Sequence, residues 1–219
     1  MRTWADAIVL AGGQSRRMGR PKALLPWRQG SLLQEVVDGL RPLFRDVLVV
    51  SRADALLPPI VGARMVYDSV PEAVAPNDGL RGPLLGIATG LAASGAPWCF
   101  VAACDMPFLS PGPILAMAQR LDGCDALVLR TGGHVQPLHA FYSCACLPEA
   151  LALLRRGKAA PMSLLDVVRT RVIDAEELGQ GPVELWDVDT PQQYVAALEA
   201  ASKLSVDGAA RPPQPLSRR

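Results

Sequence analysis

The chain has 219 residues, of which 50% are hydrophobic, and its 22 Lys and Arg balance 21 Asp and Glu to a formal net charge of +1. This length suits one domain with a sizeable core, because domains commonly hold roughly 100–200 residues. The balanced charge argues against nucleic-acid or membrane-surface partners, and no apolar stretch approaches the ~18 residues of a membrane span.

Short apolar runs alternate with longer amphipathic segments along the first two thirds of the chain. Such runs predict strands, and apolar residues at helical spacing predict helices between them. Ser110 followed by Pro111 is typical of a helix start, with serine as the N-cap and proline at the first helical position. The predicted elements are a strand at 7–11, a helix at 31–43, strands at 46–50 and 64–67, a helix at 82–94, a strand at 98–103, a helix at 110–121 and a strand at 125–129.

The last third of the chain has a less regular pattern. Thr190 and Pro191 mark the start of its final helix in the same way. Residues 204–219 hold three prolines among small and basic residues, which predicts a disordered tail behind one domain over 1–203. The elements predicted before the tail are an extended run at 136–142, helices at 147–156 and 163–168, strands at 171–174 and 183–188, and a helix at 190–203.

Strands that are apolar on both faces and alternate with helices indicate an α/β fold with a mostly parallel sheet covered on both sides. Ligands of such sheets bind beyond the carboxyl ends of the strands. Site residues are therefore expected directly after Leu10, Val50, Tyr67, Ala103 and Val188.

The five cysteines are an odd number without the paired spacings of a zinc site, so we expect reduced thiols. A metal site or a redox pair at Cys144 and Cys146 is the alternative. His134 and His139 are the only histidines, which excludes a histidine-rich metal centre. Asp6 interrupts the short apolar run near the start, unlike a signal peptide, so we expect a soluble cytoplasmic protein.

The loop from Leu10 to Lys22 combines three glycines with four cations. Glycines let backbone N–H groups approach a ligand, and consecutive donors form an anion-binding concavity. Arginine adds a planar fork that matches phosphate oxygens. The spacing fits neither the Walker sequence nor G-x-G-x-x-G. We interpret the loop as a phosphate-binding element, with an ordinary turn carrying solvated arginines as the alternative. The residues concerned are Gly12, Gly13 and Gly19 with Arg16, Arg17, Arg20 and Lys22.

A carboxylate, Asp105, follows the predicted strand at 98–103. At such a buried position it has to be paired, hydrogen-bonded or bound to a metal. Beside a polyphosphate the natural partner is Mg²⁺, which binds through one or two carboxylates and phosphate oxygens. The alternative is a cap on the turn into Pro107. The neighbouring cationic loop favours the metal.

Two further carboxylates, Asp187 and Asp189, lie at the last predicted strand-to-helix junction. Alternation along a strand places them on one face. Asp189 is a candidate second metal ligand. Its alternative role is to cap the last helix, which Thr190 can already do.

These segments, in this order and spacing, resemble the nucleotidyltransferases of the molybdenum cofactor guanylyltransferase family over about residues 7–201. The resemblance implies a single Rossmann-like α/β domain with a mixed, mostly parallel sheet and helices on both faces. It also implies Mg²⁺-dependent transfer of GMP from GTP to the phosphate of molybdopterin cofactor, with release of pyrophosphate. The most specific run is Leu-Ala-Gly-Gly-x-Ser-x-Arg-Met-Gly…Lys over 10–22, supported by the runs at 82–87, 104–109, 136–140 and 188–191.

The resemblance also assigns roles to single residues. Lys22 lies on the phosphates, and Asp105 contacts both the nucleotide and Mg²⁺, with Asp189 as the further metal candidate. Lys22 and Arg17 stabilise the charge that develops when the acceptor phosphate attacks the α-phosphorus in line, a reaction that needs alignment and charge neutralisation. The nucleotide-binding set is Leu10, Ala11, Gly12, Gly13, Lys22, Ser51, Asp68 and Asp105, in which the backbone of Leu10, Ala11 and Gly12 holds the guanine end and Ser51 and Asp68 lie near the base or ribose.

Other interpretations stay open at this stage. The Pro21-Lys22 pair is more typical of cytidylyltransferases and of sugar- or alditol-type transferases, whereas Gly12-Gly13 favours guanine. A non-catalytic nucleotide-binding module is a third reading, against which the intact Lys22 and Asp105 argue. His139 either lines the acceptor side or is a structural residue of an apolar strand. The implied partners are GTP and molybdopterin cofactor, with molybdoenzymes or their chaperones as further candidates.

Overall fold

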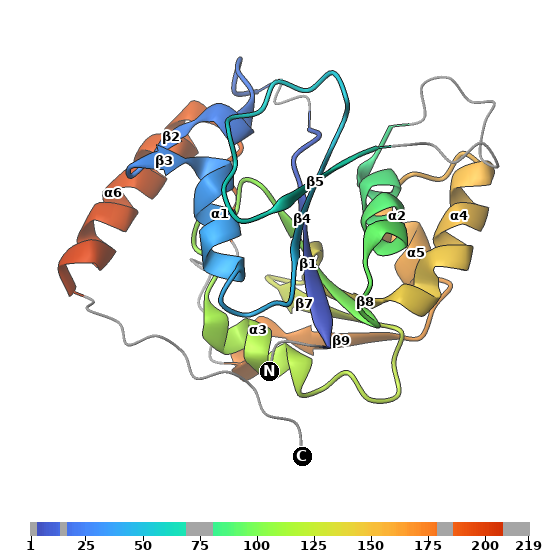
Figure 1. Ribbon diagram of the computed structural model, residues 1–219. Helices are drawn as coiled ribbons and strands as arrows, with labels where there is room; N and C mark the ends of the chain where they lie inside the picture. The colour runs from blue at the N-terminus through green and yellow to red at the C-terminus, as the bar shows by residue number, and fades with distance from the viewer. Residues whose placement is uncertain (1–3, 14–16, 69–80, 179–185, 208–219) are drawn as a thin grey trace.

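The computed structural model describes residues 4–13, 17–68, 81–178 and 186–207. Its centre is a seven-stranded mixed sheet (Figure 1). The strand order is β5-β4-β1-β6-β8-β7-β9. In this sheet β8 is antiparallel to both neighbours, and the other pairs are parallel. The predicted α/β fold with a mostly parallel sheet is therefore confirmed. The strands are β1 (Ala5–Leu10), β4 (Val47–Ser51), β5 (Arg64–Tyr67), β6 (Trp98–Ala103), β7 (Ala126–Thr131), β8 (His134–Ser143) and β9 (Thr170–Asp174).

The reversal of β8 follows from two glycines between β7 and β8. Gly132 and Gly133 have φ angles of 53° and 79°. A two-residue loop with positive φ at both positions is the hairpin turn that matches the twist of antiparallel strands. The hairpin extends both strands beyond the predicted ends at 129 and 136.

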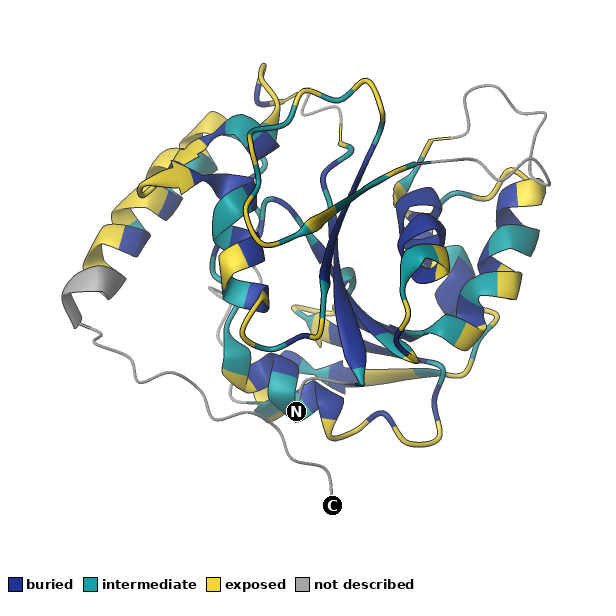
Figure 2. Cartoon of the chain, viewed as in Figure 1, coloured by how far each residue is buried: buried dark blue, intermediate teal, exposed yellow. Residues whose placement is uncertain are grey.

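Helices cover both faces of the sheet, as Figure 1 shows. One face packs under α1 (Leu32–Leu40) and α3 (Pro111–Ala118), and the other under α2 (Pro83–Ala93), α4 (Leu147–Arg155) and α5 (Pro161–Leu165). The strands between the two layers are mostly buried (Figure 2). This sandwich explains why the central strands read as continuous apolar runs.

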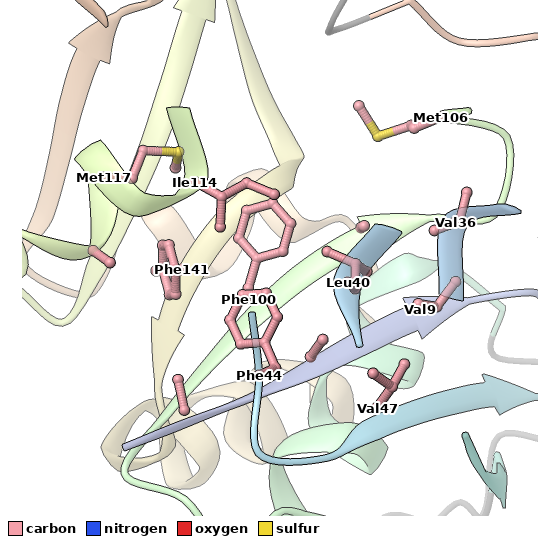
Figure 3. Close-up of a cluster of buried hydrophobic side chains, with 14 of the residues drawn as sticks. Val9, Val36, Leu40, Phe44, Val47, Phe100, Met106, Ile114, Met117 and Phe141 are labelled. Atoms are coloured by element: carbon pink, nitrogen blue, oxygen red, sulfur yellow. The ribbon is translucent and has the colours of Figure 1, made fainter. Parts of the chain in front are cut away.

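Aromatic rings fill the face beneath α1 and α3 (Figure 3). Phe100 lies between two others, with ring centroids 5.7 Å from Phe44 and 5.1 Å from Phe141. On the opposite face, α2 lies close to β1. A Cβ atom on Gly90 would come within 2.6 Å of the Ile8 side chain, so a glycine is needed at that contact.

A smaller cluster joins the C-terminal helix to the loop after β1. In it α6 (Pro191–Asp207) packs against the two-stranded sheet of β2 (Pro26–Trp27) and β3 (Gly30–Ser31). Its buried residues are Met18, Leu25, Trp27, Leu32, Val188, Ala197 and Ala201. Segments from the two ends of the sequence are thereby held together.

Several boundaries differ from the sequence-based predictions. The strand predicted at 183–188 lies partly outside the described residues, and 186–188 belong to no strand. The helix predicted at 163–168 begins earlier, at Pro161, and α3 ends at Ala118. Helix α6 continues to Asp207, four residues into the predicted tail, and 208–219 lie outside the described residues.

The helices in the described residues lack the combination of length and apolar character needed to cross a bilayer. The other short elements are the 3-10 helices η1 (Lys22–Leu24), η3 (Cys144–Cys146) and η4 (Ala175–Leu178).

A buried carboxylate fastens β1 to its surroundings and provides a stability test. Asp6 is fully buried and accepts hydrogen bonds from Arg45 (2.9 and 2.7 Å) and from the Ser94 hydroxyl (2.6 Å). Asp6→Ala should lower the free energy of unfolding by about 3 kcal/mol, the lower end for breaking a buried pair, because Arg45 still reaches solvent. Urea denaturation measures this change.

The matched control is Asp174→Ala, which breaks a similar two-point pair with Arg130 at an exposed position. That variant should lose less than about 1 kcal/mol. Equal losses in the two variants would contradict the assigned role of Asp6.

Candidate active site

A cleft of about 1540 Å³ opens at the carboxyl edge of the sheet. The loop after β1, the segment after β4, Asp68 after β5 and Asp105 after β6 all line it. The start of α2 lines the same cleft, through Gly82, Pro83 and Gly86. The edge is the one at which parallel α/β sheets bind ligands, and it brings together most of the predicted site residues.

The first wall of the cleft is the start of the loop over residues 10–22, here called the glycine loop. Leu10, Ala11, Gly12 and Gly13 all line it. The Ala11 N–H donates to the Val50 carbonyl (2.9 Å), so the backbone is fixed to the sheet up to that residue. Beyond it, Gly13 is exposed, and an added Cβ there would meet no neighbouring atom within 4 Å in the described structure. Arg16 lies outside the described residues.

Ser51, expected beside the base or ribose, is fully buried and does not line the cleft. Its hydroxyl donates to the carbonyl of Ala11 at 3.5 Å. The side chain therefore supports the loop backbone from beneath. Position alone could not reveal this, because the final residue of a strand can turn either way.

Asp68 lies beside the loop after β1 and the first turn of α2. A Cβ on Gly12 would be 3.8 Å from its Oδ2, and one on Gly86 of α2 would be 3.7 Å from its Oδ1. Its Oδ1 is buried without a hydrogen-bond partner among the described residues. Burial raises the pKa of this carboxyl, and the charge of Arg52 partly opposes the rise. A carboxylate oxygen with unused acceptor capacity at this point suits a ligand hydroxyl.

The chemical centre of the cleft is an ion cluster around Lys22. Its ammonium contacts Asp105 Oδ2 at 2.5 Å and also the Oδ1 of Asp189. Arg17 reaches the other oxygen of Asp189 at 3.3 Å. The Lys22 and Asp105 side chains are only 13% and 14% exposed, so water screens this pair weakly.

The charges in this cluster support one another. Burial lowers the pKa of Lys22, but the two carboxylates outweigh it and hold the pKa above its usual value. The hydrogen bond from Lys22 in turn lowers the pKa of Asp189. Asp187 responds differently: burial, together with repulsion from Asp105 and Asp189, raises its pKa to about 7.

The segment before α6 holds Asp189 in place. The Val188 N–H donates to the Asp105 carbonyl at 3.0 Å, which ties this segment to the end of β6. Thr190 caps α6, as predicted, by accepting from the Gln193 N–H (3.2 Å). Gln193 Oε1 accepts from the N–H groups of both Asp189 and Thr190 at 2.9 Å. This reciprocal capping box orients the aspartate, and the Thr-x-x-Gln spacing could have revealed it.

The carboxylate oxygens of Asp105 and Asp189 fit a divalent cation that would also be bound by a ligand in the cleft. Asp105 Oδ1 is buried and has no partner among the described residues, and Asp189 lies on the same ammonium. Within those residues, no group of three or more His, Cys, Asp or Glu is arranged to hold a metal. Two carboxylates nevertheless match Mg²⁺, which takes its other ligands from phosphates and water.

His139 is part of β8 and does not line the cleft. It is fully buried, and its ring meets the edge of Phe100 at a centroid distance of 5.1 Å. Burial lowers its pKa to about 3, so the ring is neutral. Neither ring nitrogen has a hydrogen-bond partner among the described residues. Its burial in the core, outside the cleft lining, fits the structural role rather than the acceptor wall.

All five cysteines are free. Cys144 and Cys146 show no pairing with each other; the Sγ of Cys144 lies 3.9 Å from that of Cys99.

Three charged residues of the cleft were not predicted: Arg52, Asp54 and Arg81. Arg52 and Asp54 form a two-point ion pair. Arg52 lies two residues after Val50, where the sequence analysis expected site residues, so its position could have identified it. Arg81 reaches the cleft through the start of α2, which only the tertiary structure places there.

Comparison with known proteins identifies a matching family model and similar named proteins. The family model described as the MobA-like NTP transferase domain matches residues 7–173. A Pelotomaculum thermopropionicum protein named probable molybdenum cofactor guanylyltransferase is 33% identical over 196 residues, which cover 88% of this chain and 91% of that protein.

Solved structures share the fold. The molybdopterin-guanine dinucleotide biosynthesis protein A of Archaeoglobus fulgidus gives a TM-score of 0.74 at 23% identity, covering 90% of this chain and 99% of its own. The 2-C-methyl-D-erythritol 4-phosphate cytidylyltransferase of Thermus thermophilus gives a TM-score of 0.66 at 20% identity, covering 92% and 100%. The chain belongs to the MobA-like NTP transferase domain family and is a nucleotidyltransferase.

Proposed function

We propose that this enzyme transfers GMP from GTP to the phosphate of molybdenum-molybdopterin cofactor and releases pyrophosphate. The observation that carries the proposal is the Lys22–Asp105–Asp189 cluster in the cleft beyond the glycine loop. A buried ammonium beside two carboxylates is what a polyphosphate and its cation require. The names of the relatives with about 33% identity support guanine and the molybdenum cofactor.

The reaction joins an oxygen of the acceptor phosphate to the α-phosphorus of GTP and breaks the bond from that phosphorus to the pyrophosphate oxygen. The acceptor phosphate is already an anion, so no general base is needed. The protein aligns the two phosphates and stabilises the developing negative charge.

Each part of the cleft has a task in this scheme. The backbone of Leu10, Ala11, Gly12 and Gly13 borders the guanine end, and Asp68 accepts from a ribose hydroxyl. Lys22 and Arg17 are each bound to carboxylates here, and an incoming phosphate would compete for their N–H donors. Ser51 acts through the Ala11 backbone.

Asp105 and Asp189 would hold Mg²⁺, which when bound neutralises phosphate charge. The buried, unpartnered Oδ1 of Asp105 supports this assignment.

The second candidate substrate is CTP, with the same cofactor or a sugar or polyol phosphate as acceptor. Pro21 before the loop lysine is the feature that favours it. We place either reaction in the cytoplasm, where reduced thiols persist, with molybdoenzymes or their chaperones as recipients of the product.

Replacing the metal-side carboxylate should abolish turnover. Asp105→Ala removes the oxygens shared by Lys22 and the proposed cation, so pyrophosphate release with GTP, Mg²⁺ and acceptor should fall to background. Asp174→Ala, on the remote strand β9, should keep the wild-type rate. A near-normal rate in purified, folded Asp105→Ala would remove the metal hypothesis.

Replacing the loop lysine should slow the reaction without removing it. Lys22→Ala should lower kcat by at least ~10²-fold, the scale of losing one electrostatic donor in a preorganised site. Steady-state kinetics measure this, with Lys203→Ala on the exposed side of α6 as the control. An unchanged kcat would exclude contact between Lys22 and the transferred phosphate.

The choice of base is open to a binding measurement. Because a ligand stabilises in proportion to its binding, GTP with Mg²⁺ at about 100 times its Kd should raise the melting temperature by roughly 5–10 °C. CTP at the same concentration should raise it less. A larger shift with CTP would overturn the guanine assignment in favour of the cytidylyltransferase.

A further inference from the structure

Among the described cations of the loop after β1, Arg20 has no carboxylate partner in the part of the chain that the structure describes. Arg17 and Lys22 pair with carboxylates of the ion cluster, and Arg52 pairs with Asp54. Arg20 lines the same cleft and is exposed, and within the described ranges no carboxylate pairs with it. Its N–H donors are therefore available to an anionic ligand.

An aromatic ring holds this arginine. The guanidinium carbon of Arg20 lies 5.9 Å from the centroid of the Tyr194 ring on α6. This is within the ~6 Å over which a ring attracts a cation. A ring restrains the guanidinium but, unlike a carboxylate, does not neutralise it or use its donors. The arrangement orients a cation while leaving its charge for a ligand.

Tyr194 is itself fixed to the loop from which Arg20 projects. Its hydroxyl donates to the carbonyl of Pro26, and its ring packs on the small cluster of α6. Met18, two residues before Arg20, and Leu25, five residues after it, are buried in the same cluster. Helix α6 thus anchors the chain on both sides of Arg20.

The backbone around Arg20 narrows its conformations further. Gly19 has a φ of 68°, which strongly favours glycine. Pro21 follows with φ fixed near −58°. Lys22 begins η1 directly after it, so Arg20 and Lys22 emerge two residues apart on one restrained turn.

We propose that Arg20 is a further nucleotide-binding residue that grips the β- and γ-phosphates, the part of the triphosphate that leaves as pyrophosphate, and that Tyr194 is its positioning residue. Lys22 and the carboxylates occupy the place of the α-phosphate, and Asp68 lies toward the sugar and base. A guanidinium on the same loop as Lys22, with no carboxylate partner among the described residues, matches the remaining, most highly charged portion. This inference rests on the proposed function only in taking a nucleoside triphosphate as substrate.

Direct binding to separate parts of the nucleotide tests the proposal. Inorganic pyrophosphate, GTP and GMP, each with Mg²⁺, are titrated calorimetrically into the full chain. In Arg20→Gln, pyrophosphate and GTP should bind about 10–100-fold more weakly, the loss of a charge-assisted hydrogen bond, and GMP should bind as to the wild type. Arg20→Lys should recover part of the loss.

Tyr194 variants separate positioning from folding. Tyr194→Leu removes the ring and should weaken pyrophosphate binding about 2–5-fold. Tyr194→Phe keeps the ring and should lose less. Because Tyr194 acts through Arg20, the double variant Arg20→Gln/Tyr194→Leu should bind no more weakly than Arg20→Gln alone. Val195→Ala, on the exposed side of α6, is the control and should bind like the wild type.

The outcomes are distinguishable. Wild-type pyrophosphate binding by Arg20→Gln, or an equal loss of GMP binding, would overturn the role of Arg20, and additive losses in the double variant would overturn that of Tyr194. If the wild type binds pyrophosphate but not GTP, the proposal that GTP is the substrate is wrong, while the role of Arg20 can still be tested with pyrophosphate. If it binds neither, both proposals fail.

Discussion

The ammonium of Lys22 between the carboxylates of Asp105 and Asp189 is the contact on which the candidate active site depends. These residues lie 83 and 167 positions from Lys22 in sequence, and they come from a loop, the end of a strand and the start of the last helix. Burial, together with repulsion from Asp105 and Asp189, raises the pKa of Asp187, so the carboxylates of this cluster repel one another without a cation among them. The arrangement therefore requires positive charge, which Lys22 supplies here and which a polyphosphate with its metal ion would share.

The rest of the fold serves to bring those three segments to one place. Four parallel strands, β5, β4, β1 and β6, end at the same edge and open the cleft there. The Gly132-Gly133 hairpin reverses β8, so the chain completes the sheet beside β6 without covering that edge. The chain then returns through α6, whose apolar side packs on Met18 and Leu25. The described ends of the loop after β1 are thereby held by the sheet at Ala11 and by the last helix at Met18.

The cations of the cleft differ in how they are held. Carboxylates hold Lys22 and Arg17, whereas the ring of Tyr194 holds Arg20. A carboxylate partner fixes a cation and masks its charge, and a ring fixes it with the charge still available. This difference divides the loop into a part beside the proposed metal site and a part whose positive charge is open to an anion.

Local sequence determined a large share of this protein. Apolar periodicity placed most of the strands and helices, and the glycine- and arginine-rich loop and Asp105 marked the cleft, because strand ends in a parallel sheet meet at one edge. The Thr190 cap is equally local.

What only the tertiary structure decided depends on contacts between distant residues. Ser51 turned beneath Ala11 rather than toward a ligand, and His139 lies buried against Phe100. The pairing of Lys22 with Asp189 and the contact of Arg20 with the Tyr194 ring cannot be predicted from the sequence. In both cases the partners lie more than 160 residues apart and meet only because α6 packs against the loop after β1.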